Sequence, residues 1–176
     1  MNRYLLIASL FFFACNSPSK KEEVTQAAPE ETQQHSGIKI DVYDYKGLEP
    51  LINVEDDNIH IVNFWATWCA PCVKELPYFE KINSEYADNG VDVLLVSLDF
   101  PKQYDSKLKP FLKKYDLKSK VVALDDVDQN TWIPAINEDW SGALPATIIY
   151  KGDKRKFYEG SFTYEELEHE LKQFLK

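Results

Sequence analysis

NFWATWCAPCVKELP, residues 63–77, contains two of the chain's three cysteines. The segment that leads into it, NIHIVNFWA (58–66), is rich in β-branched and aromatic residues and predicts a buried strand. The segment that follows, 71–89, predicts a helix, because Pro71 suits the first turn, Gly90 suits the end, and apolar residues recur at helical spacing at Leu76, Phe79, Ile82 and Tyr86. The cysteine pair is therefore expected where a strand ends and a helix begins.

A cysteine pair at the start of a helix is suited to thiol–disulfide exchange. With Cys69 at the cap and Cys72 one turn inside, both sulfurs lie on one helix face and can form a disulfide with little backbone change. Free N–H groups and the helix dipole favour the Cys69 thiolate and lower its pKa below the usual value of about 8.5. Cys72, covered by the turn, keeps a higher pKa. We therefore expect an outer nucleophile and an inner resolving cysteine.

The pair has three other possible roles: a zinc site, a structural disulfide and a peroxidase centre. A structural zinc site needs four ligands, and the histidines, His35, His60 and His169, are scattered; all three are interpreted as surface or linker residues, so no metal site is expected. A purely structural disulfide would stabilise weakly, because so short a loop constrains the unfolded chain little. A peroxidase would need a threonine close before its reactive cysteine, and Ala66 stands three positions before Cys69.

The remaining folded part alternates strands and helices and then closes with a hairpin. Gly152 and Asp153 form the hairpin turn, and Thr163 with Glu166 predicts a capping box at the start of the last helix. Strands are expected at 38–45, 58–66, 91–100, 120–126, 146–151 and 154–160, and helices within 47–55, 71–89 and 106–115, around Trp132 and after Thr163. This order predicts an α/β sheet, mixed at one edge, with helices on both faces.

The first residues, MNRYLLIASLFFFAC, predict a signal segment. Arg3 precedes an apolar run, 4–14, whose helix would be roughly 16 Å long, too short for a bilayer core of about 30 Å. The run ends at a small residue before Cys15, in an order similar to the lipobox of bacterial lipoproteins, although Phe12 stands where leucine is usual. We expect a signal peptide over 1–14 and a lipid on Cys15; an ordinary signal peptide with an incidental cysteine is the alternative.

Residues 15–37 are expected to be a lipid-anchored flexible tether, because they are rich in Ser, Glu, Gln, Lys and Pro and poor in aliphatic residues. The folded domain is then 38–176. The prediction is an exported, membrane-anchored lipoprotein that faces the periplasm or the cell exterior, where disulfides form and persist.

The charge composition argues against two classes of binding partner. The chain of 176 residues carries 20 Lys and Arg against 29 Asp and Glu, a net charge of −9. This balance argues against nucleic acid and against anionic lipid headgroups as electrostatic partners. The hydrophobic content of 44% is ample for a packed core in one domain of ordinary size.

The stretch 63–77, together with GALPAT at 142–147, resembles the thioredoxin superfamily and, within it, the membrane-anchored TlpA-like and ResA-like reductases. The resemblance covers roughly residues 38–176. It implies a thioredoxin-like fold with a mixed central sheet, helices on both faces, and a mid-domain strand–helix insert within about 101–140. It implies no bound cofactor.

The resemblance also implies a set of site residues. Pro145 matches the family's cis-proline, which exposes backbone groups beside the dithiol to an extended substrate, and Asn63 stands where thioredoxin has a buried aspartate. Glu75 matches a glutamate near the dithiol in ResA-like proteins; our hypothesis is that it tunes the thiol pKa values and moves a proton for Cys72, and a solvated helix glutamate is the alternative. The groove that receives substrate is expected at Trp68, Ala70, Pro71, Leu144 and Pro145.

The predicted function is reduction of disulfides in exported proteins by Cys69 and Cys72, with electrons from a membrane-embedded dithiol protein. Apocytochrome c is one candidate substrate, on resemblance alone. An oxidase or isomerase that uses the same cysteines is an alternative, although the dipeptide Ala70-Pro71 resembles the reducing members more. A non-catalytic binding module with a thioredoxin fold is another.

Overall fold

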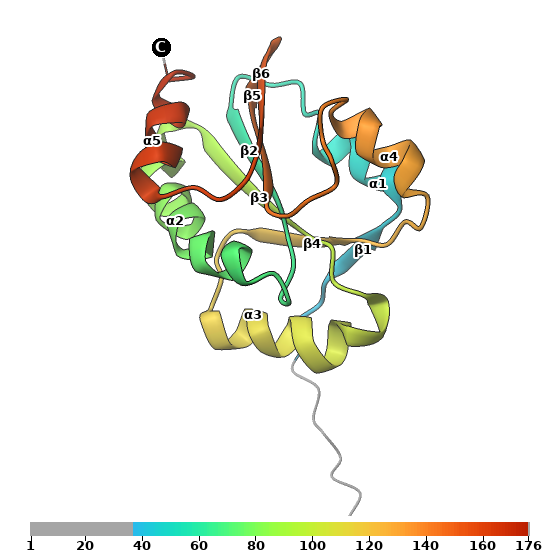
Figure 1. Cartoon of the computed structure of the whole chain (residues 1–176). Coiled ribbons are helices and arrows are strands. Elements are labelled where there is room, and N and C mark those ends of the chain that lie inside the picture. The colour runs from blue at the N-terminus through green and yellow to red at the C-terminus, as the bar shows by residue number, and fades with distance from the viewer. Residues whose placement is uncertain (1–36, 176) are drawn as a thin grey trace, which may run out of the picture. The chain divides into compact units, whose positions relative to one another are not determined.

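Figure 1 shows a central sheet with helices on both of its faces. The computed structural model describes residues 37–175, so the predicted signal segment, Cys15 and nearly all of the predicted tether lie outside the described residues. The sheet has six strands in the order β1-β4-β3-β2-β5-β6. The strands are β1 (Asp41–Tyr43), β2 (Ile59–Trp65), β3 (Val91–Ser97), β4 (Lys120–Leu124), β5 (Ala146–Lys151) and β6 (Lys154–Glu159).

The strand directions confirm the predicted mixed sheet. β1, β4, β3 and β2 run parallel, whereas β5 pairs antiparallel with β2, and β6 pairs antiparallel with β5. The helices are α1 (Tyr45–Leu48), α2 (Ala70–Tyr86), α3 (Lys109–Tyr115), α4 (Gln129–Ile136) and α5 (Tyr164–Lys172). The segment 101–140, where an insert was expected, contains α3, β4 and α4.

The helices form two layers, one on each face of the sheet, and each layer packs over its own hydrophobic core. Residues of α2, α3 and α5 pack on one face of the sheet, and residues of α1 and α4 pack on the other, as Figure 1 shows. β2 lies between the two cores, and all seven of its residues are buried. Its side chains alternate between the faces, so Ile61 and Trp65 join the α2 side while Val62 and Phe64 join the α4 side. By the same alternation, Asn63 faces α2.

The helix that carries the dithiol begins and ends close to the predicted positions. Cys69 is its N-cap, Pro71 lies in its first turn, and Pro77 lies inside it. A short 3-10 segment, η2 (Ala87–Asn89), continues it to Gly90, which has φ 70°. This positive φ favours glycine there, and a Cβ at Gly90 would also lie 2.9 Å from Asn58 Oδ1, so the Asn58 side chain would have to move.

Several predicted boundaries differ from the observed ones. The first strand is limited to β1, and the helix expected within 47–55 begins earlier as α1 and continues as the 3-10 segment η1 (Glu49–Leu51). Residues before α3 form a 3-10 turn, η3 (Pro101–Gln103), and a π-helix, η4 (Tyr104–Leu108). Pro110 lies in the first turn of α3 and has no N–H that could continue the hydrogen bonds of η4, so regular α-helix begins only at Lys109.

The hairpin of β5 and β6 and the capping box of α5 are confirmed. The Thr163 side chain accepts from the backbone N–H of Glu166, and the Glu166 side chain accepts from the backbone N–H of Thr163. Within residues 37–175, no helix has the length and apolar character that crossing a membrane requires.

Candidate active site

The two cysteines lie at the junction of β2 and α2 and form a disulfide with an S–S distance of 2.00 Å. Cys69 is 6% exposed, whereas Cys72 is fully buried. The backbone N–H of Cys72 donates to Cys69 Sγ at 3.3 Å. Charge on the outer sulfur is therefore stabilised by a backbone donor at the helix N-terminus, and that sulfur is the one that solvent and a partner can reach.

A buried aspartate holds the loop in front of the dithiol. Asp99, 2% exposed, follows β3 and accepts from the backbone N–H of Thr67 at 3.0 Å and from the hydroxyl of Ser97 at 2.9 Å. The Thr67 hydroxyl also donates to it. The loop that ends at Cys69 is thereby tied to the neighbouring strand. Sequence reasoning missed Asp99; an acidic residue directly after the apolar run of β3 was the available signal.

Glu75 is 1% exposed, so the interpretation of it as a solvated helix residue is wrong. Its Oε1 accepts from Asn63 Nδ2 at 3.0 Å, and its Oε2 accepts from the backbone N–H of Phe162 at 2.8 Å. Burial raises the pKa of Glu75 from 4.5 to about 7, although both hydrogen bonds act in the opposite direction by stabilising the carboxylate. A group with this pKa exchanges its proton near neutral pH.

Asn63 connects three elements through one amide. Its Nδ2 donates to Glu75 on α2 and, at 3.1 Å, to Thr147 Oγ1 on β5. Thr147 lies directly opposite Asn63 in the antiparallel register of β2 and β5. Asn63, which stands where thioredoxin has a buried aspartate, is therefore a hydrogen-bond donor here. The acidic group of this buried network is Glu75.

The Leu144–Pro145 peptide bond is cis, as the resemblance implies. A cavity of about 520 Å³ opens beside Cys69 and contains four of the predicted groove residues, Trp68, Ala70, Pro71 and Leu144. Pro145 is the next residue after Leu144 but is not among the lining residues. Sequence reasoning missed the other residues that line this cavity, which are Leu98, Phe100, Gln129, Trp132, Ile133, Gly142 and Ala143.

The interpretation of His60 as a surface residue is wrong, because it lies buried on the central strand β2. Its ring stacks on Tyr150 with centroids 4.9 Å apart. His169 is exposed on α5, and His35 lies outside the described residues.

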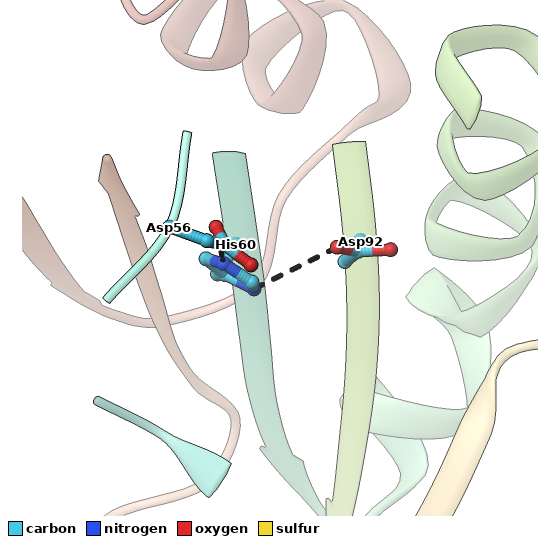
Figure 2. Close-up of side chains that lie close together, drawn as sticks. All are labelled: Asp56, His60 and Asp92. Atoms are coloured by element: carbon cyan, nitrogen blue, oxygen red, sulfur yellow. Dashed lines mark hydrogen bonds and ion pairs between the residues drawn. The ribbon is translucent and has the colours of Figure 1, made fainter. Parts of the chain in front are cut away.

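Figure 2 shows His60 between two aspartates. Nε2 lies 2.8 Å from Asp56 Oδ1, and Nδ1 lies 3.9 Å from Asp92 Oδ2 on the paired position of β3. These three side chains offer one imidazole and two carboxylate ligands within 4.8 Å of one another, a donor set that zinc and manganese accept. Because the two carboxylates face different ring nitrogens, the arrangement fits a polar bridge across the strand ends better than a shared metal. The bridge lies at the start of β2, whereas the dithiol follows its end.

Residues 24–155 match the model of the AhpC/TSA family. The chain belongs to this family. It is 31% identical, over 89% of its length and 81% of the relative's, to the thiol-disulfide oxidoreductase ResA of Bacillus cereus (strain ATCC 10987 / NRS 248). It is 32% identical, over 87% of its length and 83% of the relative's, to the thioredoxin-like protein YneN of Bacillus subtilis (strain 168).

Solved structures confirm the thioredoxin-like fold. A thiol:disulfide interchange protein of the thioredoxin family from Chlorobium tepidum TLS superposes with a TM-score of 0.57 at 21% identity, over 68% of this chain and 81% of that one. A thioredoxin-related protein from Neisseria meningitidis serogroup B superposes with a TM-score of 0.58 at 24% identity, over 69% and 87%. With the family, these relatives and the bonded CxxC pair together, the protein is a ResA-type thiol–disulfide oxidoreductase.

Proposed function

We propose that the protein works as a reductant of disulfides in exported proteins, with Cys69 as nucleophile and Cys72 as resolving cysteine. The observation that carries the proposal is the asymmetry of the pair: Cys69 lines a cavity and its sulfur accepts a backbone N–H, whereas Cys72 is fully buried and lines no such cavity. Attack by the accessible, stabilised thiolate followed by internal attack from the buried thiol is the sequence that this asymmetry favours.

The electron balance of the proposed reaction is as follows. The Cys69 thiolate attacks one substrate sulfur, the substrate S–S bond breaks, and the other substrate sulfur leaves as a thiolate that takes a proton. Cys72 loses its proton and attacks Cys69 Sγ, which releases the second substrate thiolate. Two electrons have then passed to the substrate, and the pair is left as the observed disulfide. A membrane-embedded dithiol protein would return two electrons to it.

Glu75 is the proposed proton acceptor for Cys72. It lies three residues after Cys72 on α2, so the two side chains share a helix face. A pKa of about 7 lets the carboxylate accept a proton at neutral pH and release it again. Glu75 also lines a cavity of about 240 Å³ together with Lys74 and Tyr78, among others, and we propose that its proton exchanges with solvent on this side. Glu75→Gln is expected to slow the resolving step, with less effect on the attack by Cys69.

The proposed location is outside the cytoplasm, on a lipid anchor at Cys15 after removal of residues 1–14. The apolar run before Cys15 supports it, and an enzyme that acts on protein disulfides suits an oxidising compartment, where disulfides form and persist. The proposal for the tether is that residues 15–37 hold the domain 38–176 at the membrane. When cells are grown with a radioactive fatty acid, the wild type is expected to be labelled and the Cys15→Ser variant is not. Equal labelling of the two would contradict a lipid on Cys15.

The decisive experiment is the reduction potential of the Cys69–Cys72 pair, measured in the full chain with Cys15→Ser so that only one thiol pair titrates. A value near about −270 mV supports a reductant that needs a dedicated electron supply. A value near about −120 mV makes the protein an oxidant and overturns the proposed direction. A Cys69→Ser variant that still supports the cellular function would instead indicate a binding module. Apocytochrome c, a substrate suggested by resemblance, is tested as one purified disulfide substrate among others.

A further inference from the structure

Positive charge is concentrated in one segment of this acidic chain. Residues 106–120 carry six lysines and one acidic residue, Asp116, whereas the rest of the chain carries 14 basic against 28 acidic side chains. The net charge of −9, which argues against anionic lipid as a partner, therefore averages over two regions of opposite sign. Salt screens exposed charges beyond about 8 Å at physiological ionic strength, so a surface that meets this segment senses its local positive charge.

The lysines of this segment lie on the side turned away from the core. Leu108 at the end of η4 and Leu112 on α3 are buried, whereas Lys113 and Lys114 on α3 are exposed. The segment is thus amphipathic: one side packs on the core, and the other presents positive charge to solvent. Its exposed lysines are Lys107, Lys113, Lys114, Lys118 and Lys120.

Most of these positive charges are not neutralised within the domain. Lys109 forms an ion pair with Asp105, and Lys118 forms one with Asp116 at 2.7 Å. Among residues 37–175, no ion pair is found for the other four lysines of the segment, which are Lys107, Lys113, Lys114 and Lys120. Their charge is therefore available to an external anionic surface.

An exposed aromatic ring lies beside these lysines. Tyr115 is 46% exposed, and its ring stacks on that of Phe111 with centroids 4.3 Å apart. Lys114 Nζ lies 5.0 Å from the centroid of the Tyr115 ring. A tyrosine next to lysines suits the headgroup region of a membrane, because its ring is apolar while its hydroxyl remains hydrated.

The chain enters the folded domain next to this segment. Ile38 and Ile40 line a cavity of about 390 Å³ together with Leu112 and Lys113. The proposed tether, residues 15–37, therefore joins the domain beside the lysines, and a tethered surface meets the membrane at high effective concentration. No residue of 106–120 lines the cavity beside Cys69, so a contact through this segment leaves that cavity open.

We propose that the outer side of η4 and α3 is a docking surface for an anionic lipid membrane. All six basic residues of the segment are lysines, and lysine carries a compact, hydrated charge without the planar fork with which arginine recognises single carboxylates. Such charges suit the diffuse negative potential of a lipid surface better than a specific acidic protein. Because the apolar side of α3 packs on the core, the helix lies on the headgroups without inserting.

The inference goes beyond the proposed disulfide exchange, and it rests on the proposed lipid anchor only for the position of the tether. The test therefore uses the full chain with Cys15→Ser, to which no lipid can be attached at that position. Co-sedimentation measures its Kd for vesicles of phosphatidylcholine and for vesicles of an equal mixture of phosphatidylcholine and phosphatidylglycerol. The apolar run 4–14 contributes to both, so the ratio of the two Kd values isolates the effect of anionic lipid.

We expect the chain to bind the mixed vesicles at least about thirtyfold more tightly, and this preference should disappear in about 1 M salt. Lys113→Gln/Lys114→Gln should reduce the preference by about tenfold or more, since each lysine near such a surface contributes about fivefold. Lys46→Gln/Lys151→Gln removes two exposed lysines from α1 and β5, changes the net charge by the same amount, and should reduce the preference by less than about twofold. Both variants should keep the wild-type rate with a small disulfide reagent, which shows that they are folded.

The inference is overturned by equal Kd values of the parent chain for the two kinds of vesicle, or by equal losses of preference in the two lysine variants. Binding to polyglutamate that depends on Lys113 and Lys114, without a preference for phosphatidylglycerol, would also overturn it and would indicate an acidic protein partner. Fatty-acid labelling tests the anchor separately. A chain that is not labelled, yet prefers phosphatidylglycerol vesicles through these lysines, would lose the proposed anchor and keep the docking surface.

Discussion

Cys69 and Cys72 differ in chemistry because they occupy different positions of one helical turn. The cap residue faces the free N–H groups of the helix start, and the residue one turn later is covered by packing. Residues around the pair then influence it through single side chains. Glu75 and Asp99 are the two buried carboxyl groups of this region, and each leads to a test.

Glu75 makes stability depend on pH. Its folded pKa of about 7 is raised above 4.5, so the folded chain binds this proton more tightly than the unfolded chain does. The resulting stabilisation is complete below about pH 4.5 and is lost as pH rises through about 7, for a change of roughly 3 kcal/mol. Glu75→Gln is expected to flatten this part of the curve of unfolding free energy against pH, measured by urea denaturation.

The control for this prediction is Glu165→Gln, which removes an exposed carboxyl group on α5 and should leave the slope between pH 5 and 7.5 unchanged. Equal slopes for the wild type and Glu75→Gln would contradict the raised pKa.

Asp99 is expected to stabilise the loop in front of the dithiol. Asp99→Ala leaves the backbone N–H of Thr67 and the hydroxyl of Ser97 without their buried acceptor, which should lower the free energy of unfolding by roughly 2 kcal/mol. Asp57→Ala, at an exposed position, should change it by less than about 0.5 kcal/mol. Chemical denaturation of both variants measures the difference, and equal values would show that the loop is held by other contacts.

At the scale of elements, β2 and α2 together determine where the dithiol lies. β2 is buried on both sides because it runs between two cores, and its last residue leads directly into the capped helix. α5 packs beside α2, and the backbone N–H of Phe162, which precedes α5, reaches Glu75. The end of the chain thus contributes to the surroundings of the dithiol.

The capping box of α5 gives a prediction at this scale. Thr163→Ala removes the side-chain acceptor for the N–H of Glu166 and should lower the free energy of unfolding by about 1 kcal/mol. Ser161→Ala, just outside the helix, is the control and should have little effect. Because Phe162 lies between these positions, hydrogen exchange at its amide reports whether loss of the cap also loosens the contact with Glu75; a variant as stable as the wild type would argue against the cap.

At the scale of the whole molecule, the domain should fold without the residues that precede it. Both hydrophobic cores are made of residues within 37–175. A chain that starts at residue 38 is expected to keep the unfolding midpoint of the longer protein and its rate with a small disulfide reagent. Differential scanning calorimetry and a stopped-flow assay measure the two, and a large drop in midpoint would show that residues before 38 belong to the fold.

Local patterns predicted most of the elements. The start of α2, the end of its 3-10 continuation at Gly90, the hairpin at Gly152 and the cap at Thr163 each depend on residues that are neighbours in the chain. The same reasoning placed the dithiol at the strand–helix junction. It was less accurate where prolines alter helical geometry, around Pro50 and Pro110, because short 3-10 and π segments have no clear periodicity.

The surroundings of the dithiol depend on contacts that no local pattern contains. Asp99 reaches Thr67 across 32 residues, Asn63 reaches Thr147 across 84, and Phe162 reaches Glu75 across 87. The buried state of Glu75 and His60, and the position of Phe100 in the wall of the cavity beside Cys69, follow from which strands become neighbours. The amino-acid sequence alone therefore determined the fold class and the reactive pair, since both follow from periodicity and a short motif. The proton environment of the pair and the shape of its groove were set by tertiary packing, because burial and long-range hydrogen bonds exist only once the sheet has assembled.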